Sequence, residues 1–195
     1  MNEIQKSKLI AAIKQVFPAV VQEMNNVRLP ALESAWGRTF KEEMINEDQI
    51  TVEIAKNYAR PLNNAFYRNL KELIPEFNEH TTNGSDYSYD GILIEDKNSF
   101  SDANGWVGNG FKKTPIHILK KFQVDENGKI IKAFVALVDL SKCKSAWSAK
   151  AINTNRSVIQ FTNDDVANID VVIGSIKSNR KFIKPVMEIL NNEQN

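Results

Sequence analysis

One short stretch of the chain constrains its fold more than any other: the pair Asp90-Gly91 lies between two runs of β-forming residues. An Asp-Gly pair favours a two-residue turn in which both residues have positive φ, and this turn matches the twist of two antiparallel strands. The flanking runs are 86–89 and 92–97. We therefore predict a β-hairpin, and its turn also determines the register of the two strands.

The predicted register brings three ionisable side chains to one face of this hairpin. Counting outward from the turn places Asp86 opposite Glu95, with their Cβ atoms about 5 Å apart. Alternation along the strand puts Lys97 on the same face. The opposite, core-facing side of the hairpin carries Tyr87, Ile92, Ile94 and Asp96. The carboxylate of Asp96 on that side needs a partner or a place at the sheet margin.

Two carboxylates this close repel one another unless a cation lies between them or one of them is protonated. Magnesium prefers oxygen ligands, and it commonly uses one or two carboxylates together with waters and phosphate oxygens. An adjacent amine can orient or deprotonate an attacking water, or offset charge in the transition state. Hydrolysis of a phosphodiester uses this combination. We therefore predict a catalytic site of Asp86, Glu95 and Lys97, with Mg²⁺ held by the two acids. The competing interpretation is an exposed acid–base cluster on a hairpin surface.

Apolar residues at helical spacing dominate the chain before the hairpin. One helical stripe covers 4–24, where Pro18 interrupts the pattern, and a second covers 32–45. The segment 50–55 is compatible with either a strand or a helix. A further helix is predicted over 62–74, ending near Pro75.

Strands and helices both follow the hairpin. The run Ile130–Leu140 is long and apolar, so it is expected to be a central strand. The other expected elements are a loop over 98–114, a short helix over 115–122, strands at 157–161 and 169–173, and a closing helix at 184–190. This mixture predicts one α/β domain over 1–195, with a mixed central sheet flanked by helices. Residues 1–80 form its mainly helical part, and 81–195 hold the catalytic and recognition core.

The spacing Asp86…Glu95-Asp96-Lys97 resembles the Asp…(Asp/Glu)-x-Lys signature of the PD-(D/E)XK nuclease superfamily, which includes most type II restriction endonucleases. The resemblance is strongest over 83–140. It implies a restriction-endonuclease-like sheet, magnesium-dependent cleavage of double-stranded DNA, and a homodimer, for which the N-terminal helices are candidate contacts. The proline that often precedes the first acid is replaced here by Ser85.

The resemblance leaves two choices open. Asp90 is the alternative to Asp86 as the first acid, although a turn position would point its side chain elsewhere. Many members of the superfamily add an acid from an upstream helix, and Glu53, Glu72 and Glu76 are the candidates for that role.

The polar segment 98–114 follows the site directly and is a candidate for DNA recognition. Asparagine can pair with adenine, and lysine can bind guanine or phosphate. The segment resembles the stretch after the catalytic lysine in several restriction enzymes, where a Gly-Asn and a Lys-Thr-Pro precede a helix. Trp106 is expected either to stack on a base or to anchor the segment to the core. The predicted DNA-binding residues are Asn98, Ser99, Asn104, Asn109, Lys112 and Lys113.

The charge distribution agrees with a cation held beside a polyanion, although the net charge is only +1. Residues 61–96 hold 2 basic and 7 acidic side chains, whereas residues 97–195 hold 15 basic and 9 acidic ones. Near-neutral charge counts against a structure-specific repair or junction nuclease. A non-catalytic DNA-binding domain is the remaining alternative. With one cysteine and no long apolar run, we expect a protein of the prokaryotic cytoplasm without membrane association.

Overall fold

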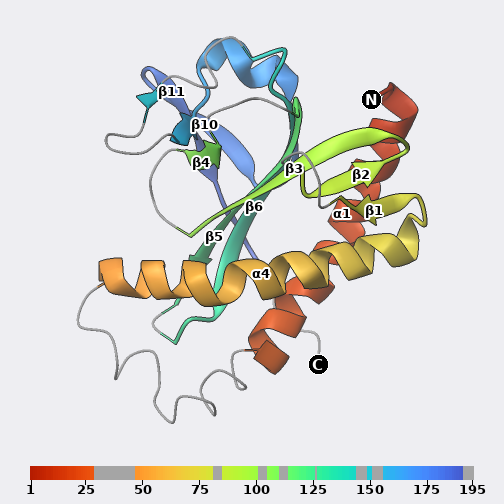
Figure 1. Ribbon diagram of the computed structural model, residues 1–195. Coiled ribbons are helices and arrows are strands. Elements are labelled where there is room, and N and C mark those ends of the chain that lie inside the picture. Colours follow the sequence, from red (N-terminus) through yellow and green to blue (C-terminus); the bar gives the residue numbers. More distant parts are fainter. Residues whose placement is uncertain are drawn as a thin grey trace.

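A computed structural model describes most of the chain as a mixed α/β structure (Figure 1). The residues it describes are 1–28, 47–80, 85–100, 105–109, 114–125, 127–143, 149–150 and 156–190. The predicted helical stripe at 32–45 lies outside these residues. None of the helices in the described ranges has both the length and the apolar character that a bilayer crossing requires.

The central sheet has seven strands in the order β1-β2-β3-β5-β6-β12, and β9 also pairs with β6. Strands β3 and β5 are parallel, and every other pair in this sheet is antiparallel. The sheet is therefore mixed, as predicted. Its strands are β1 (Phe77–Glu79), β2 (Tyr87–Tyr89), β3 (Ile92–Ser99), β5 (Ile116–Val124), β6 (Ile130–Asp139), β9 (Ile169–Ile173) and β12 (Glu188–Ile189).

Two long helices precede the sheet in the part of the chain that the structure describes. Helix α1 (Glu3–Glu23) begins at a capping box, in which the Asn2 side-chain oxygen accepts a hydrogen bond from the Gln5 backbone N–H. It continues through Pro18 and passes into a π-helical turn, η1 (Met24–Arg28), so the proline does not split it. Helix α4 (Glu47–Leu73) includes the ambiguous segment 50–55 and ends where predicted.

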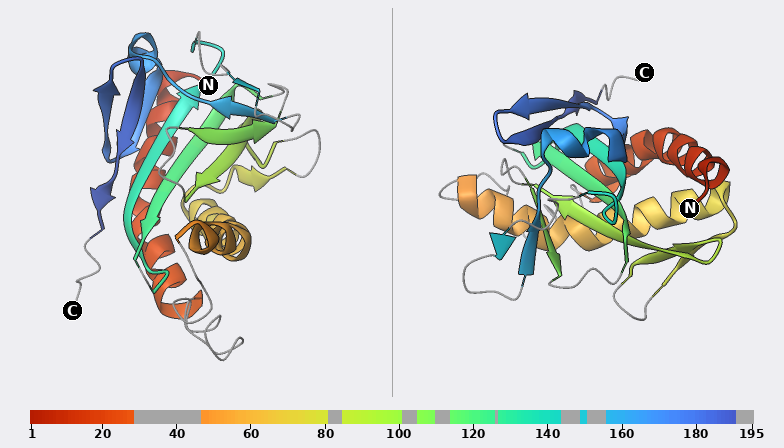
Figure 2. Two further views of the ribbon diagram at one scale, coloured as in Figure 1. Left: turned by 90° about the vertical axis from the view of Figure 1, so that its left-hand side faces the viewer. Right: turned by 90° about the horizontal axis from the view of Figure 1, so that it is seen from above.

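The two faces of the sheet are covered differently. Helices α1 and α4 pack on one face, where Phe17 stacks on Phe122 and Phe66 joins the same core. Figure 2 shows α4 nearly end-on at one side of the sheet and the β10–β11 hairpin at the other. A second core around Trp106 and Phe134 fills the opposite face. The elements on that side are β4 (Trp106–Asn109), β7 (Ala149–Lys150), β8 (Arg156–Ile159), η2 (Asn163–Asn168), β10 (Ser175–Asn179) and β11 (Phe182–Val186).

The helix predicted over 115–122 is wrong, because this segment is strand β5. Thr114 and Pro115 resemble a helix start, but the Pro115 carbonyl accepts a hydrogen bond from Leu140 N (2.8 Å) beside the sheet. Strand β5 pairs with β3 on one side and β6 on the other, and most of its residues are buried. Its long-range pairing overrides the local capping signal.

The closing helix predicted over 184–190 is also wrong. This segment contains the end of β11 and the short strand β12. Pro185 is accommodated because β11 pairs only with β10, so the missing N–H can lie on a free edge. The predicted strands at 130–140, 157–161 and 169–173 are confirmed as β6, β8 and β9 within one or two residues.

Candidate active site

The predicted hairpin is confirmed, and so is its register from the turn as far as Tyr87 and Ile94. Tyr89 pairs with Ile92, and Tyr87 pairs with Ile94. Asp90 and Gly91 form the turn with φ of 50° and 78°, which are the positive values that an Asp-Gly turn favours. The strand β3 that leaves this turn carries Glu95, Asp96 and Lys97.

Asp86 departs from the predicted pairing with Glu95. The regular ladder ends at Tyr87 and Ile94, and the Asp86 N–H donates to the Ile94 carbonyl at 3.1 Å. Its carboxylate then accepts a hydrogen bond from the Asp96 N–H at 2.7 Å. This irregular end of the ladder positions the first acid through a backbone contact on β3.

Glu95 and Lys97 form an ion pair through Oε1 and Nζ. The Glu95 side chain is only 8% exposed, and its second oxygen, Oε2, is buried and has no hydrogen-bond partner among the residues that the structure describes. Burial raises the pKa of Glu95; Lys97 opposes this shift, and nearby Asp86 and Asp96 add to it. A buried carboxylate with an unsatisfied oxygen and an acidic neighbour is a site that a cation would stabilise.

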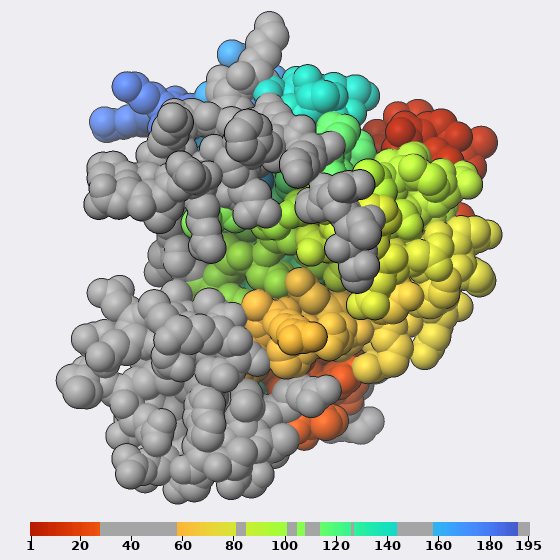
Figure 3. All heavy atoms as spheres, viewed as in Figure 1, coloured from red at the N-terminus to blue at the C-terminus, as the bar shows by residue number. Residues whose placement is uncertain are grey.

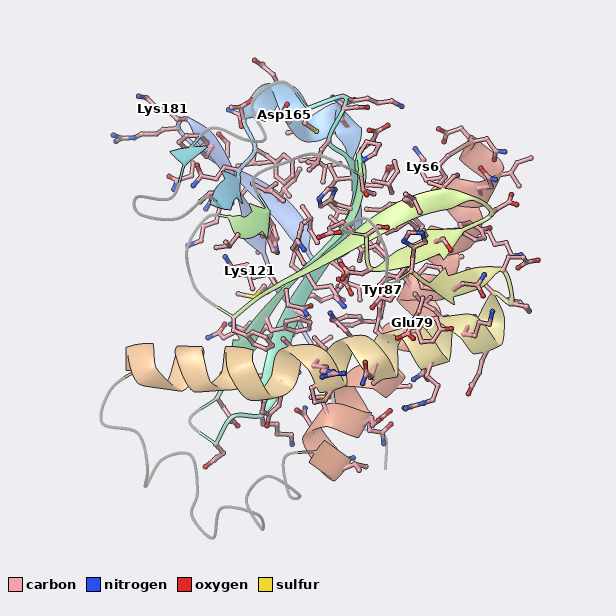
Figure 4. The ribbon with its side chains drawn as sticks, viewed as in Figure 1. Lys6, Glu79, Tyr87, Lys121, Asp165 and Lys181 are labelled. Carbon is pink, nitrogen blue, oxygen red and sulfur yellow. The ribbon has the colours of Figure 1, made fainter. Side chains whose placement is uncertain are left out.

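The side chains of Asp86, Glu95 and Lys97 line one cleft of about 640 Å³ between α4 and the hairpin. In Figure 3 the surface of the hairpin lies directly beside that of α4. Figure 4 shows the labelled Glu79 and Tyr87 at this boundary. The complete lining of described residues is Ala59, Arg60, Asn63, Asn64, Glu79, His80, Ser85, Asp86, Tyr87, Glu95 and Lys97.

The alternative acids lie elsewhere. Asp90 is at the turn, where its carboxylate accepts a hydrogen bond from the Gln5 side chain at 2.5 Å. Glu76 is exposed and pairs with Lys8 at 3.6 Å. Glu72 is exposed and does not line the cleft, and the side chain of Glu53 lies outside the described residues. The geometry therefore favours Asp86 as the first acid.

The predicted DNA-binding residues lie in different environments, and some of them lie outside the described residues. Asn98 donates to the Asn63 side chain at 2.7 Å and its own oxygen is buried, so it faces the interior beneath α4. Ser99 is half-buried at the end of β3, and Asn109 ends β4, with its side chain not described. Asn104, Lys112 and Lys113 lie outside the described residues. The segment is not a continuous loop, because β3 extends into it and β4 lies within it.

Trp106 anchors this segment to the core. Its side chain is buried, and its indole N–H donates to the Lys120 carbonyl at 2.8 Å. The indole also packs near Phe134 and Phe161. Of the two expected roles for Trp106, the geometry supports the structural one.

A buried polar cluster lies directly behind the cleft. Lys120 Nζ and Asp96 Oδ2 are 2.7 Å apart, and both side chains are fully buried. The Tyr87 hydroxyl donates to the same oxygen at 3.0 Å, and burial raises the pKa of Tyr87. The oxygen of the Asn63 side chain accepts from Lys120 at 3.2 Å and from Asn98. Together these five residues, the buried polar cluster, join α4, β2, β3 and β5.

Several lining residues were missed by the sequence analysis. Arg60, Asn63 and Asn64 have the spacing of one helical face, Glu79 is the last residue of the short strand β1, and His80 follows it. The polar stripe of α4 is the one signal that could have indicated them. His80 and Ser85 hydrogen-bond through Nδ1 and Oγ at 2.8 Å at the rim of the cleft.

The acidic groups of the cleft do not form a complete protein cage for a metal ion among the described residues. Among the described residues, no cluster of three or more His, Cys, Asp or Glu side chains could hold a metal. Asp86 and Glu95 supply two hard oxygen donors, and water and substrate phosphate would complete the coordination. Comparison with protein-family models and with curated proteins finds no match to this chain.

Proposed function

We propose that this chain is a magnesium-dependent deoxyribonuclease that cuts double-stranded DNA at a short specific site, as type II restriction endonucleases do. The observation that carries the proposal is the buried, unpartnered Oε2 of Glu95 in a cleft shared with Asp86 and Lys97. Asp96 in the buried polar cluster also has a buried oxygen, Oδ1, with no hydrogen-bond partner among the described residues, but Asp96 does not line the cleft. One Glu95 oxygen is paired with Lys97, whereas the other has no hydrogen-bond partner among the described residues and has the acidic neighbour Asp86.

Each of the three residues has a distinct role in this proposal. Asp86 and Glu95 would hold Mg²⁺, which when bound supplies charge neutralisation at the phosphate and acidifies a water. Lys97, held beside Glu95, orients the attacking water and offsets the negative charge that develops on the phosphorus oxygens. The Asp96 N–H keeps the Asp86 carboxylate turned toward β3. Sequence specificity and a homodimeric arrangement rest on the resemblance to restriction endonucleases.

The direct test is incubation of the purified protein with phage DNA in Mg²⁺ and, in parallel, in Ca²⁺. We expect discrete fragments in Mg²⁺, and binding without cleavage in Ca²⁺. A smear, or cutting confined to branched substrates, would replace the proposal with a structure-specific nuclease. Binding without cleavage under both conditions would leave only a DNA-binding domain.

Glu95→Gln should stabilise the metal-free protein while removing its response to Mg²⁺. Because the folded-state pKa of Glu95 is raised, ionising this group in the folded protein costs free energy at neutral pH. That cost disappears as the pH falls through the raised pKa, so the gain from Glu95→Gln should disappear in acid as well. Thermal unfolding in EDTA and in Mg²⁺ measures both effects, since Mg²⁺ should raise the Tm of the wild type and leave that of Glu95→Gln unchanged.

Glu72→Gln is the matched control for this measurement, because Glu72 is exposed and outside the cleft. Its Tm should follow that of the wild type with and without Mg²⁺. A Glu95→Gln protein that still gains stability from Mg²⁺ would show that the cation binds elsewhere.

A further inference from the structure

Helix α4 forms the wall of the cleft opposite the three predicted catalytic residues. It turns its apolar residues, including Leu62 and Phe66, into the core shared with α1. Its polar residues Arg60, Asn63 and Asn64 recur at helical spacing and line the cleft. A substrate bound beside Lys97 in this cleft would therefore face these residues of the helix.

Arg60 is the basic residue on this wall, and it is exposed. Among the described residues, no carboxylate lies within ion-pair distance of its guanidinium, whereas Arg68 on the same helix pairs with Glu23. Lys97, the other strong base lining the cleft, is already paired with Glu95. The acids in the lining, Asp86, Glu95 and Glu79, would repel a polyanion unless positive charge also faces it.

The buried polar cluster keeps this wall at a fixed distance from the hairpin. Asn63 lies one turn after Arg60, and its side-chain oxygen accepts hydrogen bonds from Lys120 on β5 and Asn98 on β3. Its backbone carbonyl oxygen also lies 3.4 Å from the Tyr87 hydroxyl oxygen on β2. Lys120 Nζ also lies 4.1 Å above the ring of Phe66. Arg60 therefore lies on a segment of α4 that contacts three strands around the site, β2, β3 and β5.

We infer that Arg60 binds a phosphate of the DNA backbone across the cleft from Lys97, so that α4 holds the strand that is cut. A guanidinium offers paired donors that match two phosphate oxygens, which a lysine ammonium does not. The adjacent Asn64 amide can donate to the same backbone. This inference rests on the proposed function, because it names the substrate group that the same cleft would take.

The test is the binding of a duplex of about 30 base pairs, roughly 100 Å long, measured in Ca²⁺ over a series of salt concentrations. For each protomer bound to the duplex, Arg60→Gln should raise Kd about tenfold, which is typical for losing one charged hydrogen-bonded contact. The slope of log Kd against log salt should fall by about 0.9 per bound protomer, the value expected for one lost phosphate contact. Arg60→Lys should keep the slope and recover part of the affinity.

Arg68→Gln removes the same charge from the same helix outside the cleft, so it separates a local contact from a change in net charge. Its salt slope should equal that of the wild type. Suppose that the wild type cuts DNA in Mg²⁺ and that Arg60→Gln has the same salt slope as the wild type. The inference is then wrong, and the proposed function is retained. A wild-type protein that does not cut DNA overturns the proposed function, and the inference with it.

Discussion

Lys97→Ala should reduce DNA cleavage to less than about one hundredth of the wild-type rate, because positioned acid–base and electrostatic groups contribute factors of this size or more. Binding of the same DNA in Ca²⁺ should remain close to that of the wild type. Lys97 pairs with Glu95 inside the cleft and is only 18% exposed, so it can act on a bound phosphate without forming the main binding contacts. Single-turnover cleavage in Mg²⁺, together with equilibrium binding in Ca²⁺, measures the two effects separately.

Lys14→Ala is the control for this variant, since Lys14 is an exposed lysine on α1 outside the cleft. It should cut at the wild-type rate. Removal of Lys97 also leaves Glu95 without its ion-pair partner, so the folded state of the variant must be verified by its Tm. Normal cleavage by a folded Lys97→Ala protein would show that the site is assigned to the wrong residues.

The hairpin is where sequence reasoning was most successful. Its register depends on one turn, and the preference of Asp90-Gly91 for positive φ is a local property. The placement of Asp86 was less accurate, because the predicted pairing assumed that a regular ladder continues past Tyr87. Whether a ladder ends in an irregular hydrogen bond depends on backbone contacts that residue types do not encode.

The errors in the second half of the chain have a common cause. A proline after a threonine is a genuine local signal for a helix start, but β5 is determined by its pairing with β3 and β6, which is not local. Alternation along β3 did indicate that Asp96 would face the core and need a partner. The identity of that partner, Lys120, follows from the parallel register of β3 and β5, which pairs Asn98 with Lys120.

Arg60 was not identified because an amphipathic pattern shows which residues of a helix are polar, and not what they face. The apolar stripe predicted this helix and its buried side only over 62–74, so Arg60 lay before the predicted helix, whereas α4 begins at Glu47. Whether the polar side meets solvent or a cleft depends on where α4 lies against β3. The contacts of Asn63 with Asn98 and Lys120, which are 35 and 57 residues away in sequence, determine that position.

The largest effect on stability is expected from Lys120→Met, which should lower the free energy of unfolding by roughly 3–5 kcal/mol. The substitution keeps most of the side-chain volume but leaves Asp96 fully buried without its ion-pair partner. Burial already raises the pKa of Asp96 despite Lys120, so the variant should regain part of its stability in acid, where Asp96 is protonated. Urea unfolding at neutral and mildly acidic pH measures both changes.

The double variant Lys120→Met with Asp96→Leu distinguishes the loss of a charge partner from the loss of packing. Replacing both members of a buried pair with apolar residues often restores stability, so the double variant should unfold closer to the wild type than Lys120→Met does. Lys177→Met, on the exposed strand β10, should have little effect. If the double variant is no more stable than Lys120→Met, the cost arises from packing around Phe66 and from the hydrogen bonds to Asn63, and the pair itself adds little to it.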